Sequence, residues 1–357
     1  MIAPAMASIN YAVEDLARYI NDEDPIPGVK LDLVSFDEAY DPSRDVPGYD
    51  WCRGKGADVI LTPVPPTAEV LRPFVERDKV PLFTWAASDP MIEPPGWVFC
   101  LGGYMPEMVG SLLEWVSEQW SNYPTKPQIG SYGWSETAEI VADKAVREYC
   151  QAHPDKFDYV SDVLIPMGAM FGSGDIGKLK DCDYVFTQGA NAGVTGFLRD
   201  FRARGYKAKW LSLDAFPSAK GLALDMCGWE ALDGTLSLLP TRWWDEAYPV
   251  VELAEKLLHT CHSGKAEELI HAGIGYIGSF HGAYMFFDIL RETVREVGAE
   301  NFDSQALYDA AVKFRRAYEG YPEWGFTETK RCAMGRGAIY EWQAKVGDLV
   351  RITDWLP

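Results

Sequence analysis

Short apolar runs alternate with helical segments along most of this chain, and this alternation limits the possible folds more than any other feature. ADVILT (57–62) and VPLFTW (80–85) are separated by a helical segment from Ala68 to Arg77. Continuous apolar runs of this length are typical of strands buried on both faces, which occur mainly in parallel sheets. The alternation therefore predicts an α/β fold with doubly wound parallel sheets.

The same pattern repeats after a helix that begins at Pro106, a residue suited to the first helical turn. The strand-like runs of this second series are QIGSY (128–132), YVSDVLI (159–165), DYVFT (183–187) and KWLSL (209–213). A chain of 357 residues is more than twice the length of a typical domain, so the two series predict two lobes.

No low-complexity linker separates the two series, which favours a three-segment hinge over one flexible tether. We expect the crossings near residues 104, 240 and 322. The N-terminal lobe would then comprise residues 1–104 plus 241–322, and the C-terminal lobe residues 105–240 plus 323–357.

Further patterns predict the elements around these sheets. An apolar face at helical spacing predicts a helix over residues 9–20, and the alternation in VKLDLVSF predicts a strand over residues 29–36. Helices are expected over residues 250–258, 274–290 and from Ser304 onward. The last residues predict a hairpin that turns at Gly347.

Composition excludes several classes of function. The net charge of −20, from 53 acidic and 33 basic side chains, repels phosphate backbones, so we expect no nucleic-acid partner. No run approaches the roughly 20 apolar residues of a membrane span. The seven cysteines contain no CxxC pair, so their spacing indicates neither a zinc framework nor a small disulfide scaffold.

Apparent cofactor and metal motifs lack the sequence context that such sites require. GSGDIG (172–177) matches a dinucleotide loop, but the next strand follows too closely for the required helix, so a surface turn is favoured. His259, Cys261 and His262 could present metal ligands on one helix face, but a helix end with incidental polar groups is favoured because no further ligand lies nearby. We therefore expect no cofactor, no metal and no enzymatic activity.

Three residues follow the ends of predicted strands, where open α/β sheets bind ligands. Trp85 and Trp134 are candidates for the wall of a small-molecule pocket, although core packing is the alternative for both. Asp214 could pair with a cationic ligand group or could instead cap the following helix.

Several segments together resemble the leucine/isoleucine/valine-binding proteins, the extracytoplasmic receptors of ABC importers with the type I periplasmic-binding fold. The order and spacing of the segments carry the resemblance, which runs through most of the chain. They are DPSRDV, GADVILTPV, VPLFTWAASDPMI, DYVFTQGANAGVTGFLRDFRARGY, LSLDAF and GDLVRITDW.

The resemblance assigns possible roles to individual residues. In TWAASDP, the Ala86 carbonyl and the Ser88 hydroxyl would hold the ammonium and carboxylate of an amino acid, and Asp214 would pair with the ammonium. Asn191, Trp134 and Phe280 would close over the ligand side chain. The family's usual serine pair is replaced by Pro65 and Pro66, followed by Thr67, which weakens a standard carboxylate clamp.

The resemblance implies a receptor that closes on an amino-acid-like, polar or aromatic solute and delivers it to a membrane ABC permease, on the periplasmic or extracellular side. A regulatory sensor with the same fold is the alternative. The first residues lack the features of a secretory signal, so either the protein is cytoplasmic or its signal is not present in this chain. The family's first strand would precede residue 1, so either another element fills its place or this chain is a shortened version of a longer one.

Overall fold

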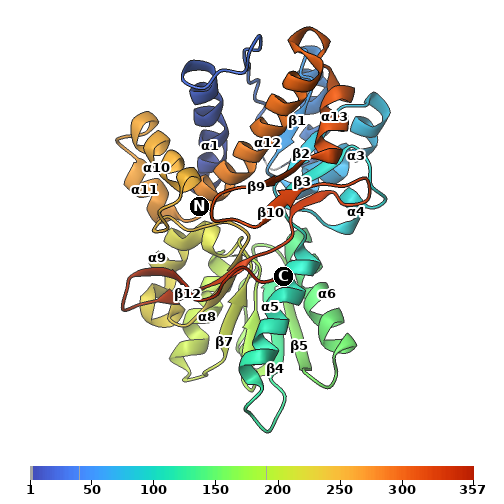
Figure 1. Ribbon diagram of the computed structural model, residues 1–357. Helices are drawn as coiled ribbons and strands as arrows, with labels where there is room; N and C mark the ends of the chain where they lie inside the picture. The colour runs from blue at the N-terminus through green and yellow to red at the C-terminus, as the bar shows by residue number, and fades with distance from the viewer. Residues whose placement is uncertain (1–2, 40, 190) are drawn as a thin grey trace.

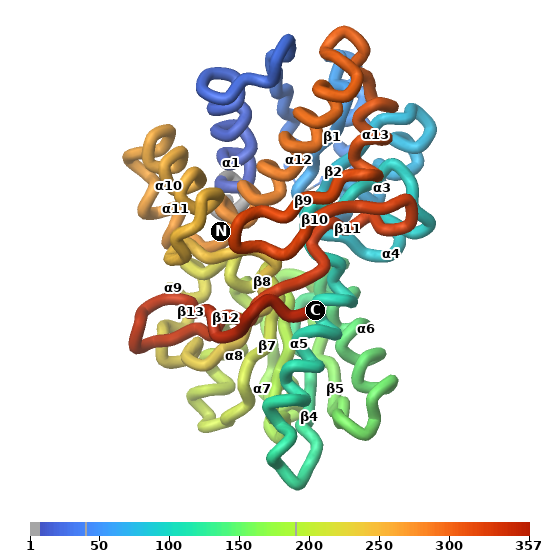
Figure 2. The backbone as a smooth tube through the Cα atoms, in the orientation of Figure 1, coloured from blue at the N-terminus to red at the C-terminus, as the bar shows by residue number. Residues whose placement is uncertain are grey.

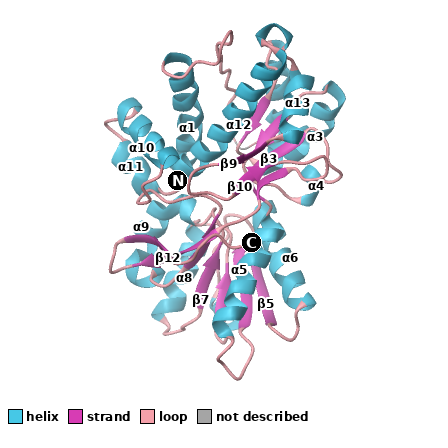
Figure 3. Cartoon of the chain, viewed as in Figure 1, coloured by secondary structure: helices cyan, strands magenta, loops and turns pink. Residues whose placement is uncertain are grey.

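The protein consists of two α/β lobes placed one above the other (Figure 1). The structure, a computed structural model, describes residues 3–39, 41–189 and 191–357. In each lobe helices cover a central sheet whose strands run mainly parallel (Figure 3). The doubly wound architecture predicted from the alternating runs is therefore confirmed.

The upper lobe contains a four-stranded parallel sheet in the order β1-β2-β3-β11. Its strands are β1 (Ile60–Thr62), β2 (Leu82–Thr84), β3 (Val98–Gly103) and β11 (Cys332–Met334). A separate antiparallel pair is formed by β9 (Arg315–Ala317) and β10 (Glu323–Gly325). The helices of this lobe are α1 (Ala3–Asp22), α2 (Asp45–Gly54), α3 (Pro65–Asp78), α4 (Asp89–Ile92), α10 (Pro249–Cys261), α11 (Ala266–Ala272), α12 (Gly275–Val297) and α13 (Ser304–Lys313), with 3-10 turns at Pro42–Arg44 and Ala299–Asn301.

The lower lobe contains a seven-stranded sheet in the order β13-β12-β8-β7-β6-β4-β5. Its strands are β4 (Gln128–Trp134), β5 (Asp158–Ile165), β6 (Tyr184–Phe186), β7 (Lys209–Ser212), β8 (Leu236–Leu239), β12 (Ala338–Gln343) and β13 (Asp348–Arg351). The first five are parallel, whereas β12 and β13 form the predicted antiparallel hairpin, with Gly347 at a φ of 78° in its turn. The helices are α5 (Met105–Trp120), α6 (Thr137–Ala152), α7 (Ser173–Lys178), α8 (Ala192–Ala203) and α9 (Lys220–Leu232), with a 3-10 turn at Pro217–Ala219.

The prediction of a strand over residues 29–36 is wrong, because these residues form no strand. The Asn21 Oδ1 accepts the Leu31 N–H at 2.8 Å, and the Asn21 Nδ2 donates to the Leu31 carbonyl at 2.9 Å. Val29 and Leu31 nevertheless pack against the core, whereas Leu33, the next apolar residue of the alternation, is exposed. GSGDIG also differs from expectation, since it forms most of the short helix α7 instead of a turn.

The chain passes between the lobes three times, as Figure 2 shows. The first crossing joins β3 to α5 and the second joins β8 to α10. The third lies after Met334, not near residue 322, because β11 still pairs with β3 of the upper sheet. The lobe boundary expected at residue 322 therefore moves to the segment between β11 and β12.

The second crossing is fixed by a buried arginine. Arg242 is only 5% exposed, donates from Nε to the Gly320 carbonyl at 3.0 Å and lies 3.5 Å from the ring centroid of Tyr248. Its partner Glu246 also accepts from Tyr340 on β12 and from Arg351 on β13. These contacts attach the crossing to elements of both lobes.

The main apolar core is continuous between the lobes. It extends from α1 and α12 beside the upper sheet, through Trp243 of the second crossing, to α8 and Trp210 beside the lower sheet. On the other face of each sheet lies one smaller apolar cluster, in the lower lobe and in the upper lobe respectively. No described helix combines the length and apolar character needed to cross a bilayer.

Candidate functional site

The carboxyl ends of the parallel strands in both lobes lie at the junction between the lobes. β3 ends at Gly103, and α5 of the lower lobe begins at Met105, so the tips of β1, β2 and β3 point toward that lobe. β8 ends at Leu239 and leads into the upper lobe, so the tips of β4 to β8 point the opposite way (Figure 3). Loops that follow strands from both sheets therefore face one another.

The loop after β2 in the upper lobe contains the predicted residues Trp85, Ala86 and Ser88. Ser88 is 1% exposed at the N-terminus of α4, and its Oγ has no hydrogen-bond partner among the described residues. The Ala86 carbonyl accepts the Thr84 hydroxyl at 3.3 Å. A buried hydroxyl without a partner is costly, so Ser88 is suited to bind a polar group supplied from outside.

Trp85 is held against α12. Its Nε1 donates to the Ser279 carbonyl at 3.2 Å. A Cβ at Gly282 would lie 2.7 Å from that nitrogen, so the missing side chain at Gly282 makes room for the indole. Trp85 is half-buried, and one edge of its ring is thus fixed by the protein.

Asp214 directly follows Leu213 at the tip of β7, as predicted, and is partly buried. Burial raises the pKa of its carboxyl to about 6, while the backbone N–H groups of Asp214 and Ala215 act in the opposite direction. No lysine, arginine or histidine among the described residues forms an ion pair with it. The carboxylate is therefore desolvated without a cation to compensate its charge.

Trp134 and Asn191 lie together at the start of α8. The Trp134 Nε1 donates to the Ala169 carbonyl at 3.3 Å and would lie 2.5 Å from a Cβ at Gly193. The Asn191 side chain accepts the N–H groups of Gly193 and Val194, both at 3.0 Å, and so caps the helix. The Asn191 oxygen is thus occupied by the backbone.

Two predicted residues are engaged elsewhere. Phe280 is fully buried in α12, with Tyr276 and Tyr284 stacked at 6.0 and 6.4 Å, so its ring belongs to the core. Thr67 lies in the first turn of α3 and donates its hydroxyl to the buried Asp45 at 3.1 Å. The Phe280 ring and the Thr67 hydroxyl are therefore both engaged within the upper lobe.

Sequence reasoning missed two polar residues beside the tip of β6. Gln188 is 3% exposed, and its Oε1 has no partner among the described residues. Glu139 is buried and accepts the Gln188 N–H with both carboxyl oxygens, at 3.1 and 3.0 Å, so it holds this loop in place. Gln188 could have been found by the rule that identified Asp214, since it follows DYVFT; nothing in the local sequence marks Glu139.

Burial raises the pKa of Glu139 well above its usual value, and the nearby Glu136 carboxylate raises it further. The carboxyl group lies against Gly133, where a Cβ would come within 2.3 Å of the Glu139 carboxyl carbon. Glycine at the end of β4 is therefore needed to accommodate this buried acid.

The predicted helix end at His259–His262 is confirmed. α10 ends at Cys261, and the His262 Nε2 lies 2.9 Å from Oδ2 of the buried Asp15. No cluster of three potential metal ligands occurs in the part of the chain that the structure describes.

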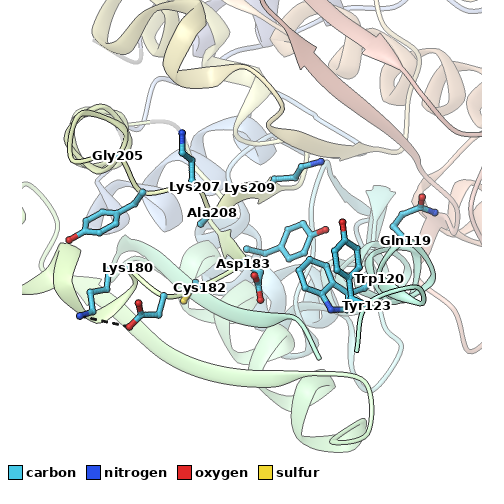
Figure 4. Close-up of a pocket in the computed structure, with 13 residues that line it drawn as sticks. Gln119, Trp120, Tyr123, Lys180, Cys182, Asp183, Gly205, Lys207, Ala208 and Lys209 are labelled. Carbon is cyan, nitrogen blue, oxygen red and sulfur yellow. Dashed lines mark ion pairs between the residues drawn. The ribbon is translucent and has the colours of Figure 1, made fainter. Parts of the chain in front are cut away.

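A surface cavity of about 500 Å³ lies at the opposite end of the lower sheet (Figure 4). It is lined by residues that precede or begin β6 and β7, including Lys180, Lys207 and Lys209, and by the stacked rings of Trp120 and Tyr123. These positions are at the amino ends of the strands, so the cavity is separate from the strand tips between the lobes.

Comparison with solved structures identifies the same fold in ABC transporter binding proteins. A branched-chain amino acid ABC transporter from Thermus thermophilus with bound valine is 17% identical, covers 99% of this chain and 92% of its own, and has a TM-score of 0.85. A fatty acid ABC transporter substrate-binding protein from Thermomonospora curvata is 13% identical over 99% of this chain and 89% of its own, with a TM-score of 0.80.

A solute-binding protein from R. palustris in complex with benzoate is 13% identical, covers 100% of this chain and 93% of its own, and has a TM-score of 0.74. At these identities the likeness establishes the fold, and the three bound or named solutes differ in chemistry. No curated protein matches the sequence.

A family model described as periplasmic binding protein matches residues 2–347, nearly the whole chain. Solved structures with the same fold include binding components of ABC transporters. The resemblance found in the sequence is thus confirmed: the chain belongs to the periplasmic binding protein family.

Proposed function

We propose that this protein is the extracytoplasmic receptor of an ABC importer and binds a small solute that carries an amino group. The solute lies between the strand tips of the two lobes, and closure of the lobes about the three crossings presents the complex to a membrane permease. Relatives that bind valine and benzoate support the receptor role and leave the class of solute to the residues of this chain.

The observation that carries the proposal is the state of Asp214. Its pKa is raised to about 6 by burial, and no cationic side chain among the described residues is paired with it. An ammonium group of the solute supplies the missing charge through a charge-assisted hydrogen bond, which is stronger than a neutral one. A receptor for a simple carboxylic acid has no use for an uncompensated carboxylate at this position.

Other groups at the strand tips support a solute of amino-acid size. The unpartnered Ser88 hydroxyl supplies a donor for a carboxylate or another acceptor, and the half-buried Trp85 and Trp134 supply apolar walls. Pro65 and Pro66 begin α3, so its first turn lacks two N–H donors, and the Thr67 hydroxyl is bonded to Asp45. Recognition of a carboxylate therefore depends on Ser88 more than on the N-terminus of α3.

The test is a ligand panel measured by thermal shift and calorimetry. It includes leucine, valine, phenylalanine, benzoate, 4-hydroxybenzoate and a medium-chain fatty acid, each with the wild-type protein and with Asp214→Asn. A solute present at 100 times its Kd stabilises the fold by about 2.7 kcal/mol. We expect an amine-bearing solute to stabilise the wild type and to lose most of that effect in Asp214→Asn. Binding of benzoate or a fatty acid with equal strength in both proteins would disprove the proposed solute class.

A further inference from the structure

Two cysteines far apart in the sequence occupy adjacent strands of the upper sheet. Cys100 lies in β3 and Cys332 in β11, and their Cα atoms are paired in the parallel ladder. Both are free thiols and are 0% and 2% exposed. The pair is therefore formed by the fold and not by proximity in sequence.

The geometry of the two strands suits a disulfide bond. Neighbouring strands are about 4.8 Å apart, which is inside the range of about 4.4 to 6.8 Å that disulfides span between Cα atoms. Paired residues of adjacent strands project to the same face of a sheet, and both cysteines belong to one apolar cluster on that face. The pairing becomes irregular between Cys332 and Met334, so β11 is not held in a continuous ladder at this point.

The ionisation of Cys332 also reflects the contact. The pKa of its thiol is raised well above the usual value, first by the neighbouring Cys100 thiol and then by burial. For Cys52, Cys150, Cys182, Cys227 and Cys261, burial is the first cause of a raised thiol pKa, and no cysteine contributes. Among the seven, only this pair shows mutual contact in the described part of the chain.

We propose that Cys100 and Cys332 form a structural disulfide when the chain folds in an oxidising environment. The oxidant is a small-molecule or protein disulfide: the two thiols lose two protons and two electrons, one S–S bond forms, and the oxidant is reduced to two thiols. Formation of the same bond in a cell depends on the extracytoplasmic location proposed above. The ability of the two thiols to form the bond in vitro does not depend on that location.

Burial determines when the bond forms. A thiolate is the attacking species, so a buried thiol with a raised pKa reacts slowly in the folded protein. The bond therefore forms during folding, before β11 closes against β3, and afterwards resists reductants that cannot reach it. Since β3 leads into the first crossing and β11 into the third, the bond links two crossings at their origin in the upper lobe.

The experiment is refolding of the full chain in a mixture of reduced and oxidised glutathione, compared with refolding in dithiothreitol. Under denaturing conditions we expect the oxidised sample to expose two fewer reactive thiols than the seven of the reduced chain and to be lighter by two hydrogen atoms. Peptide mapping is expected to join the segments that contain Cys100 and Cys332. The oxidised form is expected to melt about 5 °C or more above the reduced form.

Two variants make the assignment specific. Cys332→Ala is expected to show the same number of thiols after oxidative and reductive refolding, whereas Cys182→Ala, which removes another buried cysteine, still loses two. Seven reactive thiols after oxidative refolding, or a map that joins another pair, would overturn the proposal. If Cys332→Ala fails to fold, the peptide map of the wild-type protein decides. Neither measurement involves a ligand, so a failure of the proposed solute class leaves this result independent.

Discussion

Affinity for an amine-bearing solute is expected to fall as the solution is acidified through pH 6, because Asp214 must be ionised to pair with the ammonium group. Burial raises the pKa of this carboxyl to about 6, while the backbone N–H groups of Asp214 and Ala215 favour its charged form. A bound ammonium ion lowers the pKa again. Protonation of Asp214 and binding of the solute therefore oppose each other.

The magnitude follows from that pKa. At pH 7 most Asp214 carboxyls are ionised in the free protein, whereas at pH 5 about one in ten is. If the bound carboxyl stays ionised at both values, the affinity falls about tenfold over this interval, or about 1.4 kcal/mol of binding free energy. The change levels off above pH 7, where the free carboxyl is already charged.

The assay is isothermal titration calorimetry with leucine, or with the amino acid of the panel that binds most tightly, at half-unit steps from pH 5 to pH 8. Asp214→Asn is the matched control because it preserves the shape of the side chain and removes the titration. We expect weak binding and a flat profile for this variant. A flat profile in the wild type, or the same slope in both proteins, would refute the role given to Asp214.

Two further outcomes are expected. Without ligand, Asp214→Asn is expected to stabilise the fold by about 2 kcal/mol at pH 8 and to have no stabilising effect below pH 4. The reason is that the folded-state pKa of Asp214 lies above its ordinary value, so the stability associated with the protonated carboxyl is lost as the pH rises through 6. Urea unfolding at the two pH values measures the effect, and a loss of stability at pH 8 would contradict it. Gly133→Ala is expected to lower the unfolding free energy by about 1 to 3 kcal/mol, because its Cβ would collide with the buried Glu139 carboxyl. The control Gly174→Ala, with nothing within 4 Å of its Cβ, should change the unfolding free energy by less than about 0.5 kcal/mol. Equal effects of the two substitutions would show that Glu139 is not confined by Gly133.

Sequence patterns predicted the elements where burial follows the period of the structure. ADVILT and VPLFTW contain β1 and β2, and the strand-like runs of the second series overlap most of β4 and β5 and contain β6 and β7. The failure at residues 29–36 has a physical cause: alternating apolar residues report burial of one face, and Leu31 achieves that burial while its backbone is bonded to Asn21 and not to a strand.

One sequence rule was sufficient to place three candidate residues at strand tips. The tip of a parallel strand is a place for ligands, and this rule located Trp85, Trp134 and Asp214. It did not show that the Asn191 oxygen caps α8 or that Phe280 is enclosed by Tyr276 and Tyr284. Those outcomes depend on which groups compete for the same hydrogen bonds and the same volume.

The amino-acid sequence by itself determined the two parallel sheets and placed Asp214 at the end of a strand, because both follow from local periodicity and chain direction. The tertiary structure alone decided the neighbours of each side chain. It left Ser88 without a hydrogen-bond partner, fitted Glu139 beneath the loop after β6 and paired Cys100 with Cys332 across 232 positions of the chain. Such contacts join segments that are distant in sequence, and only the packing of the complete fold brings them together.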